Sequence, residues 1–444
     1  MTITRISRRQ FLKTSTIISA SLAGPIFFTG CAVNPVTGKK QLMMVSPQQE
    51  IGIDREQSPF QFSSDYGITK DPGVNEYISD VGRKLLPNVH RPQMPYSFQC
   101  VNATYINAYA FPGGTIAVTR GILLKLNNEA QLAALLGHEL GHVNARHSAE
   151  QVSKGQLSSL LLAGLSIAAS TKSSALGDLT QQLGMLGQGL LLSKYSRDNE
   201  READSLGNEY MVKAGYSSKG FVQLMEMLDS LNKTKPSSAQ VLFSTHPMST
   251  ERLTAAVQRE TGIYQHSKNS YLNGERYMDS LASLRTQKSG IELLQQGENH
   301  LGKKEYDKAQ KLFIKSLNTL KNDYTAHVLM AKCHLLRKKP EQALAFAEIA
   351  KKIYPSEVQG HYIAGIAEKE LKKYTMAYKN FDTCDRLLPG NPQMIFYKGY
   401  CLDKKGNIKP AATNYMTYLN MTRNQPNEYG RYAYNRLRQW GYAK

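Results

Sequence analysis

The sequence lacks an uninterrupted apolar stretch long enough to cross a membrane as a helix. Its most apolar pieces past residue 150, at 157–169 and 176–192, fall short of the roughly 20 consecutive apolar residues that a span requires. They are rich in Leu, Gly, Ala and Ser, with little charge. Two interpretations stay open for them: helices that cover a cleft, or ordinary core.

Two further absences exclude classes of site. The five cysteines include no close C-x-x-C pair, so a zinc–cysteine site is unsupported. Lys and Arg outnumber Asp and Glu by 55 to 36, a net charge of +19, but they form no compact basic and aromatic cluster that would indicate nucleic-acid recognition. The excess favours acidic partners or an anionic membrane surface, or it serves solubility alone. The 444 residues suffice for two or three domains.

The first 30 residues have the features of an export signal. From Ser7 the chain reads S-R-R-Q-F-L-K, which resembles the twin-arginine signal, and a moderately apolar run at 14–28 follows. The run leads into F-T-G-C, which resembles a bacterial lipobox whose cysteine, Cys31, is acylated and becomes the mature N-terminus.

We therefore predict a signal peptide at 1–30 and a lipid-attached tether at 31–70, which is polar, is broken by Pro and Gly, and could hold a short helical stretch around 48–57. The protein would be a periplasmic, membrane-attached lipoprotein exported by the twin-arginine route, with the outer membrane favoured over the inner. A soluble exported protein and an uncleaved anchor are the alternatives.

The chain is organised around an H-E-x-x-H pattern inside a helical run at 129–147. Apolar residues recur there at helical spacing, so one stripe of the helix faces a core. Four residues make about one turn, so His138 and His142 project from the same face. Two neutral imidazoles in this arrangement can hold zinc, and Glu139 between them can act as general base on a water molecule. The alternative is two ordinary histidines on a helix.

A catalytic zinc site needs a third protein ligand, which we expect on a second helix. Glu200 and Asp204 are four residues apart and share a helix face. Glu200 is the predicted ligand, while Asp204 would accept a hydrogen bond from the other ring nitrogen of a ligating histidine. By the same periodicity Glu202 points elsewhere, so we expect it to be solvated.

His147 is the alternative third ligand. A metzincin would need glycine at position 145 and histidine at 148, whereas this chain has Ala145 and Ser148. His147 is therefore expected to be a surface residue near the end of the helix.

A small sheet is predicted between two helical regions. An amphipathic helix at 74–86 comes first, and β-prone segments follow at 96–101 and 115–119. The residues between them, 107–114, break into a turn. The strand immediately before the zinc helix is expected to bind a substrate backbone by strand addition, although a plain structural hairpin would give the same pattern.

These segments together resemble metallopeptidases of the CAAX-prenyl-protease/HtpX type, over roughly residues 70–260. The resemblance implies a gluzincin-type α+β protease domain at 71–265, mostly helical with a small sheet, that binds one zinc ion per chain. The segment T-H-P-M-S-T-E-R-L also fits the family, which implies that His246 and Arg252 lie near the metal. His246 would stabilise the oxyanion of the tetrahedral intermediate, or occupy the open zinc position and keep the enzyme latent.

A repeat follows a predicted linker at 266–290. Alanines recur every 34 residues, and small residues stand twelve positions before each of them: Ala309, Ala343, Ala377 and Ala411 after Gly297, Ala331, Gly365 and Gly399. This period is typical of tetratricopeptide repeats, so an all-α solenoid of about four repeats is predicted at 291–444, with Trp440 on a capping helix. The region has 26 Lys and Arg against 14 Asp and Glu. A solvated outer face and an acid-binding groove both fit this charge.

Within the family, a catalytic domain followed by repeats most resembles the periplasmic BepA-type proteases. That resemblance implies a zinc endopeptidase in quality control or assembly of envelope proteins. Its substrates would be unfolded or misassembled proteins, and its repeats would dock on the outer-membrane β-barrel assembly machinery. A chaperone or scaffold with a latent or structural zinc site, and a housekeeping peptidase for misfolded lipoproteins, are the alternatives. Cys384 and Cys401 fall on adjacent repeat helices, either bridged or as buried thiols.

Overall fold

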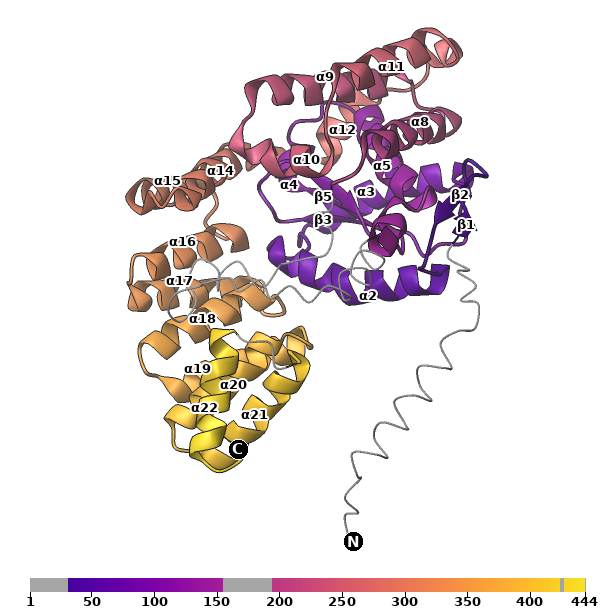
Figure 1. The fold of residues 1–444 in the computed structure, drawn as a ribbon. Coiled ribbons are helices and arrows are strands. Elements are labelled where there is room, and N and C mark those ends of the chain that lie inside the picture. Colours follow the sequence, from indigo (N-terminus) through magenta and orange to yellow (C-terminus); the bar gives the residue numbers. More distant parts are fainter. Residues whose placement is uncertain (1–30, 155–193, 424–426, 444) are drawn as a thin grey trace, which may run out of the picture.

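The computed structural model describes residues 31–154, 194–423 and 427–443. The predicted signal peptide and the apolar pieces at 157–169 and 176–192 lie outside the described residues. Figure 1 shows a helical body around a small sheet, from which a curved stack of helix pairs descends. No helix in the described part of the chain combines the length and apolarity of a membrane span.

The described residues start with a hairpin and a long helix, where a tether with only a short helical stretch was expected. Strands β1 (Cys31–Val33) and β2 (Lys40–Leu42) pair antiparallel, and α2 (Pro47–Ser64) follows. Ser46 and Gln49 form a capping box at the start of α2, and Pro47 suits the first helical position. The expected tether is thus wrong for this segment, because α2 buries Glu50 against two arginines of the helical body.

Helix α3 (Pro72–Leu85) and the short η1 (Leu86–Asn88) precede a three-stranded sheet. The strands are β3 (Ser97–Val101), β4 (Ala108–Ala110) and β5 (Thr115–Thr119), in the order β3-β5-β4. β5 is central, parallel to β3 and antiparallel to β4, and it is almost entirely buried. The expected turn at 107–114 therefore contains an edge strand, which the turn-prone Pro112-Gly113-Gly114 concealed.

The core of this domain is built by four helices: α4 (Arg120–Leu123), α5 (Glu129–Asn144), α8 (Arg197–Lys213) and α9 (Lys219–Thr234). After α9 come η3 (Ser237–Ala239), α10 (Gln240–Thr245) and α11 (Thr250–Thr261). α5 and α8 cross very closely, because glycines line the crossing: a Cβ added to Gly207 would lie 2.6 Å from the backbone nitrogen of His138. Close approach of the two backbones sets the separation of the side chains between them.

The expected linker at 266–290 is also folded. It contains η4 (Gln265–Ser267), α12 (Gly274–Ser280), α13 (Ala282–Thr286) and the start of α14. Tyr277 is fully buried, and its hydroxyl donates to the carbonyl of Leu123 at 2.6 Å. The polar composition that suggested a linker belongs to the outer faces of these short helices.

Eight helices form four antiparallel pairs, and one more helix caps the stack. The pairs are α14 (Lys288–Gly302) with α15 (Tyr306–Thr319), α16 (Tyr324–Leu336) with α17 (Pro340–Ile353), α18 (Val358–Glu370) with α19 (Tyr374–Leu387), and α20 (Pro392–Lys404) with α21 (Ile408–Met421). The predicted small residues lie at the packing points. A Cβ on Gly297 would stand 2.3 Å from the Phe313 ring, and the recurring alanines are fully buried. Helix α22 (Glu428–Gln439) caps the stack, and Trp440 stacks on Tyr415.

The repeat domain is docked on the first domain through buried polar contacts. Arg120 forms an ion pair with Asp323 at the start of α16, and the Tyr66 hydroxyl donates to Glu298 on α14 at 2.8 Å. The Ser63 hydroxyl, at the end of α2, donates to Glu357 at 2.5 Å. Partners on both sides of the junction hold the two domains together.

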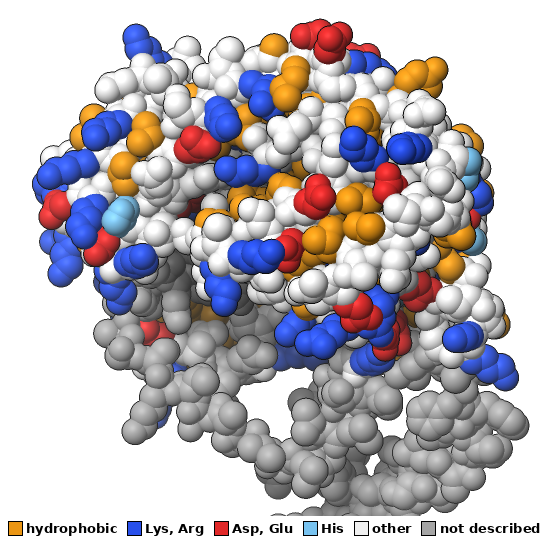
Figure 2. Space-filling view, turned by 90° about the horizontal axis from the view of Figure 1, so that it is seen from above, with side chains coloured by type: hydrophobic (Ala, Val, Ile, Leu, Met, Phe, Trp, Pro, Cys, Tyr) orange, Lys and Arg blue, Asp and Glu red, His pale blue; other side chains and the backbone are white. Residues whose placement is uncertain are grey.

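The predicted architecture, a mostly helical α+β domain followed by an all-α solenoid, is confirmed. Cys384 and Cys401, for which a bridge stayed open, are buried free thiols. Seen from above, basic and acidic side chains are interspersed over the face around α9 and α11, and basic ones are densest toward α14 and α15 (Figure 2).

Candidate metal centre

His138 and His142 project from one face of α5, as the sequence predicts. Both side chains are buried, and their Nε2 atoms lie 3.0 Å apart. Asn128 caps the helix by accepting from the backbone nitrogen of Gln131, and the apolar face around Leu136 and Leu140 packs into the core. The helix therefore presents two imidazole nitrogens at a single point inside the domain.

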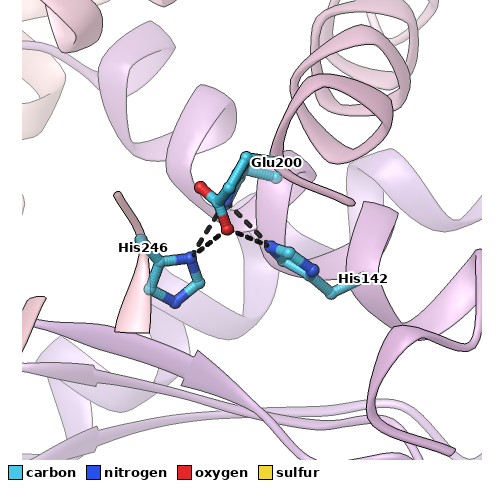
Figure 3. A group of neighbouring side chains, drawn as sticks. His142, Glu200 and His246 are labelled. Carbon is cyan, nitrogen blue, oxygen red and sulfur yellow. Dashed lines mark hydrogen bonds and ion pairs between the residues drawn. The ribbon is translucent and has the colours of Figure 1, made fainter. Parts of the chain in front are cut away.

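Glu200, in the first turns of α8, supplies a carboxylate to the same point. Its Oε1 lies 3.4 Å from His142 Nε2, and its Oε2 lies 3.6 Å from His138 Nε2. Figure 3 shows the carboxylate between the imidazoles of His142 and His246. The predicted ligands thus come together from two helices separated by more than 50 residues of chain.

Asp204 and Arg252 lie behind the ligands. Asp204 Oδ1 is 2.9 Å from His138 Nδ1, so Asp204 faces the ring nitrogen that its predicted role concerns, and that role stays a prediction. Arg252, on α11, donates to both oxygens of Asp204 at 2.7 Å and lies 2.6 Å from Glu200 Oε2. Arg252 thus lies beside the predicted ligands, as the resemblance implies. Its guanidinium engages two carboxylates and orients them, and a catalytic role for Arg252 stays a prediction.

His246 follows α10 and reaches into the cluster. Its Nδ1 is 3.0 Å from Glu200 Oε1 and 3.4 Å from His138 Nε2. One ligand atom from each of His138, His142, Glu200 and His246 lies within 4.8 Å of the others, and all four residues are buried. Three histidines and a carboxylate form a donor set that suits zinc, so the residues fit the metal that the sequence implies.

The charges in the cluster support one another. Burial raises the pKa of Glu200, but His246 and Arg252 outweigh it and hold that pKa well below its ordinary value. Burial lowers the pKa of His142, which favours the neutral imidazole that a metal needs. Glu200 is thus ionised, and His142 beside it is neutral.

Glu139 lies beside the cluster with one free acceptor. Its Oε2 is buried and has no hydrogen-bond partner among the described residues, while burial raises the pKa of its carboxyl. An apolar pocket adjoins it, lined by side chains from α5, α9 and α10, among them Leu135, Leu228 and Leu242. A carboxylate placed in this way can accept a proton from a molecule bound at the cluster.

The edge strand β4 runs past the site, and the segment that carries His246 covers part of it. The backbone nitrogen of Ile106, just before β4, donates to the carbonyl of Ser238 at 2.7 Å. Tyr109, Thr245 and His246 line one small pocket between strand and loop. The edge that strand addition would use is therefore β4, rather than the strand directly before the metal helix.

The expectation for His147 is wrong, because its side chain is 1% exposed and contacts a ligand. Its Nδ1 lies 2.9 Å from His142 Nδ1. A continuous helix would turn a residue five positions on by about 140° away from His142. However, α5 ends at Asn144, and Arg146 adopts a left-handed backbone (φ 61°) that turns the chain back. No local pattern in the sequence signals this turn.

Glu202 was expected to be solvated, but it is the partner of His147. Its Oε2 lies 3.3 Å from His147 Nε2, and its Oε1 accepts from Asn34 Nδ2 at 3.2 Å. Its side chain is 25% exposed. Helical periodicity correctly turned Glu202 away from the metal ligands, but it could not reveal a contact with the N-terminal hairpin.

Known proteins resemble the domain that contains this cluster. A model of peptidase family M48 matches residues 72–260. Metalloprotease YcaL of Escherichia coli is 34% identical over 184 residues, which cover 41% of this chain and 69% of YcaL. Metalloprotease LoiP of the same organism is 31% identical over 192 residues, 42% of this chain and 72% of LoiP.

A third relative has a longer chain. The β-barrel assembly-enhancing protease of Escherichia coli is 28% identical over 229 residues, which cover 50% of this chain and 46% of that protein. The chain therefore spans less than half the length of the β-barrel assembly-enhancing proteases that it matches.

Proposed function

Because the chain belongs to peptidase family M48, we propose that it is a zinc-dependent endopeptidase of the bacterial envelope. The observation that carries the proposal is the buried cluster of His138, His142 and Glu200 with the free carboxylate oxygen of Glu139 beside it. Bound zinc supplies Lewis acidity toward a water molecule and the scissile carbonyl. Glu139 would take a proton from that water as the water oxygen bonds to the carbonyl carbon, and would pass the proton to the leaving amide nitrogen as the C–N bond breaks.

We further propose that the described conformation is latent, with His246 as a fourth ligand. A catalytic zinc site keeps one position open for water or substrate, whereas a fourth protein donor closes it. His246 Nδ1 lies as close to the donor atoms of Glu200 and His138 as two ligands of the same metal ion lie to each other. Activation then requires the loop after α10 to move away, which also uncovers the edge of β4.

The location and partners are proposals of the same kind. An acylated Cys31 would tether the protein to the periplasmic face of the outer membrane, after export by the twin-arginine route. Two relatives are named β-barrel assembly-enhancing proteases. These names support the proposal that the substrates are unfolded or misassembled envelope proteins. The repeat domain would capture these substrates or dock on the assembly machinery.

The test pairs metal analysis with proteolysis of casein by the mature chain. We expect about one zinc ion per chain and little cleavage by the wild type. His246→Ala should release activity, and Glu139→Gln in the His246→Ala background should keep the zinc while cleavage falls by about 10²–10⁴-fold. His266→Ala, at an exposed histidine, is the matched control and should leave the protein latent.

Each result decides between the proposals. Full activity in the wild type refutes the latch but leaves the protease. Zinc without cleavage in the wild type and in His246→Ala favours a chaperone or scaffold with a structural metal. Unaltered cleavage in the Glu139→Gln variant would remove Glu139 as the base.

A further inference from the structure

A chain of hydrogen bonds runs from His142 to the surface of the domain. His142 Nε2 faces Glu200, so its Nδ1 must carry the ring proton if Nε2 is to bind a metal. That proton points at His147 Nδ1, 2.9 Å away, which must therefore accept. His147 Nε2 then carries the proton of its own ring and donates to Glu202 Oε2 at 3.3 Å. Each donor in the series meets an acceptor.

The N-terminal hairpin supplies the last member. Asn34 lies in the turn between β1 and β2 and is 4% exposed. Its amide nitrogen donates to Glu202 Oε1 at 3.2 Å, while its carbonyl oxygen accepts from the backbone nitrogens of Val36 and Thr37. Gln41, on β2, donates to the carbonyl of Ala145 directly after the metal helix, at 3.4 Å. The hairpin thus contacts both Glu202 and the start of the turn that leads to His147.

The two ligating histidines consequently have different partners. Asp204 contacts His138 directly, whereas the imidazole of His147 stands between His142 and the carboxylate of Glu202. Glu202 accepts from His147 through one oxygen and from Asn34 through the other. A carboxylate held in this way at the end of the series favours the required tautomer of each ring.

We propose that His147 and Glu202 are positioning residues that fix the tautomer and orientation of His142, and that the 31–42 hairpin completes this arrangement through Asn34. The inference rests on the proposed zinc centre. It makes the segment next to the predicted lipid attachment point a structural part of the metal site. Metal affinity therefore depends on the hairpin being docked.

The test measures the zinc dissociation constant of the full chain by competition with a chromophoric chelator. The absorption spectrum of the cobalt(II)-substituted protein reports ligand geometry at the same time. His147→Leu removes the acceptor and should weaken zinc binding by about 10–100-fold and alter the cobalt spectrum. His147→Asn places an amide oxygen near the position of Nδ1 and should recover much of the affinity.

Two variants test the outer part of the series without changing the buried ring. Glu202→Ala removes the carboxylate. Asn34→Asp keeps the oxygen that holds the turn but sets an anion against Glu202. Both should weaken zinc binding in the same direction as His147→Leu. Glu209→Ala is the matched control, because Glu209 lies on the same helix and pairs only with Lys213 on the surface in the described structure.

The results separate this inference from the proposed function. A wild type that binds no zinc refutes the metal centre itself. A wild type that binds zinc, with folded Glu202→Ala and Asn34→Asp variants of equal affinity, overturns the positioning role alone. If His147→Leu fails to fold, these two variants decide. Loss of affinity in Glu209→Ala would show that the effect is not specific to the series, and would overturn it as well.

Discussion

Replacing Gly207 by alanine tests how closely α8 must approach α5 for the metal ligands to meet. The added Cβ would lie 2.6 Å from the backbone nitrogen of His138, whereas ordinary contact begins near 3.4 Å. The atoms in its way are backbone, so the helices must separate by about 0.8 Å, the difference between these two distances. Glu200 lies two turns earlier on α8 and moves with it.

Two effects of opposite sign set the change in stability. Overpacking costs about 1–3 kcal/mol, while alanine favours the helix over glycine by about 1 kcal/mol. The free energy of unfolding should therefore fall by about 0–2 kcal/mol. The metal site is more sensitive, because zinc–ligand distances tolerate only about 0.2 Å. We expect zinc affinity to fall at least about tenfold, equivalent to about 1.4 kcal/mol.

Thermal unfolding of the metal-free protein and chelator competition measure the two effects separately. Gly52→Ala is the control, since Gly52 lies within α2 and has no atom within 4 Å of an added Cβ. That variant should gain about 0.5–1 kcal/mol of stability and keep its zinc affinity. A Gly207→Ala protein with the zinc affinity of the wild type would refute the argument that this crossing sets the ligand geometry.

Three further predictions concern buried charges. Burial raises the pKa of Glu298 in the folded state, so this acid contributes less stability as pH rises above its ordinary value of 4.5. Glu298→Gln should therefore gain stability relative to the wild type as pH rises from 4.5, in urea unfolding followed across pH; parallel profiles would contradict this. Asp323→Ala leaves Arg120 buried without its ion-pair partner, so the free energy of the first transition in urea unfolding should fall by about 3–5 kcal/mol. An unchanged transition would show that this ion pair does not hold the two domains together. Arg252→Lys keeps the charge but not the fork that binds Asp204, so zinc affinity should fall by about tenfold in chelator competition, whereas equal affinity would reduce Arg252 to a simple counter-charge.

The resemblance to the CAAX-prenyl-protease/HtpX type of metallopeptidase is confirmed by the family match, and so is the predicted enzyme class. Its signals were local or periodic. His138 and His142 are one helical turn apart, Glu200 and Asp204 are another such pair, and the alanines of the repeats recur every 34 residues. Spacings of this kind are set by helix geometry, so the sequence alone contains them.

Other features depend on contacts between distant segments. The hairpin and α2 are polar and interrupted by Pro and Gly, so their composition predicts a tether. In the structure, Glu50 of α2 forms ion pairs with Arg91 and Arg146, which attach the segment to the domain. β4 contains only three residues, and its pairing with β5 decides that it is a strand. Short elements of low intrinsic preference form only where tertiary contacts supply the missing stability.

By itself, the sequence determined the four-repeat solenoid and the family, and it predicted the candidate metal ligands and the candidate general base, because each follows from residue type at helical or repeat spacing. Only the tertiary structure decided that His147 turns back onto His142, that Glu202 meets Asn34 across 168 positions of the chain, and that the hairpin belongs to the metal centre. These contacts depend on a left-handed residue at position 146 and on the close crossing of α5 with α8. Neither is expressed in a periodic pattern, since both arise from the path of the backbone in space.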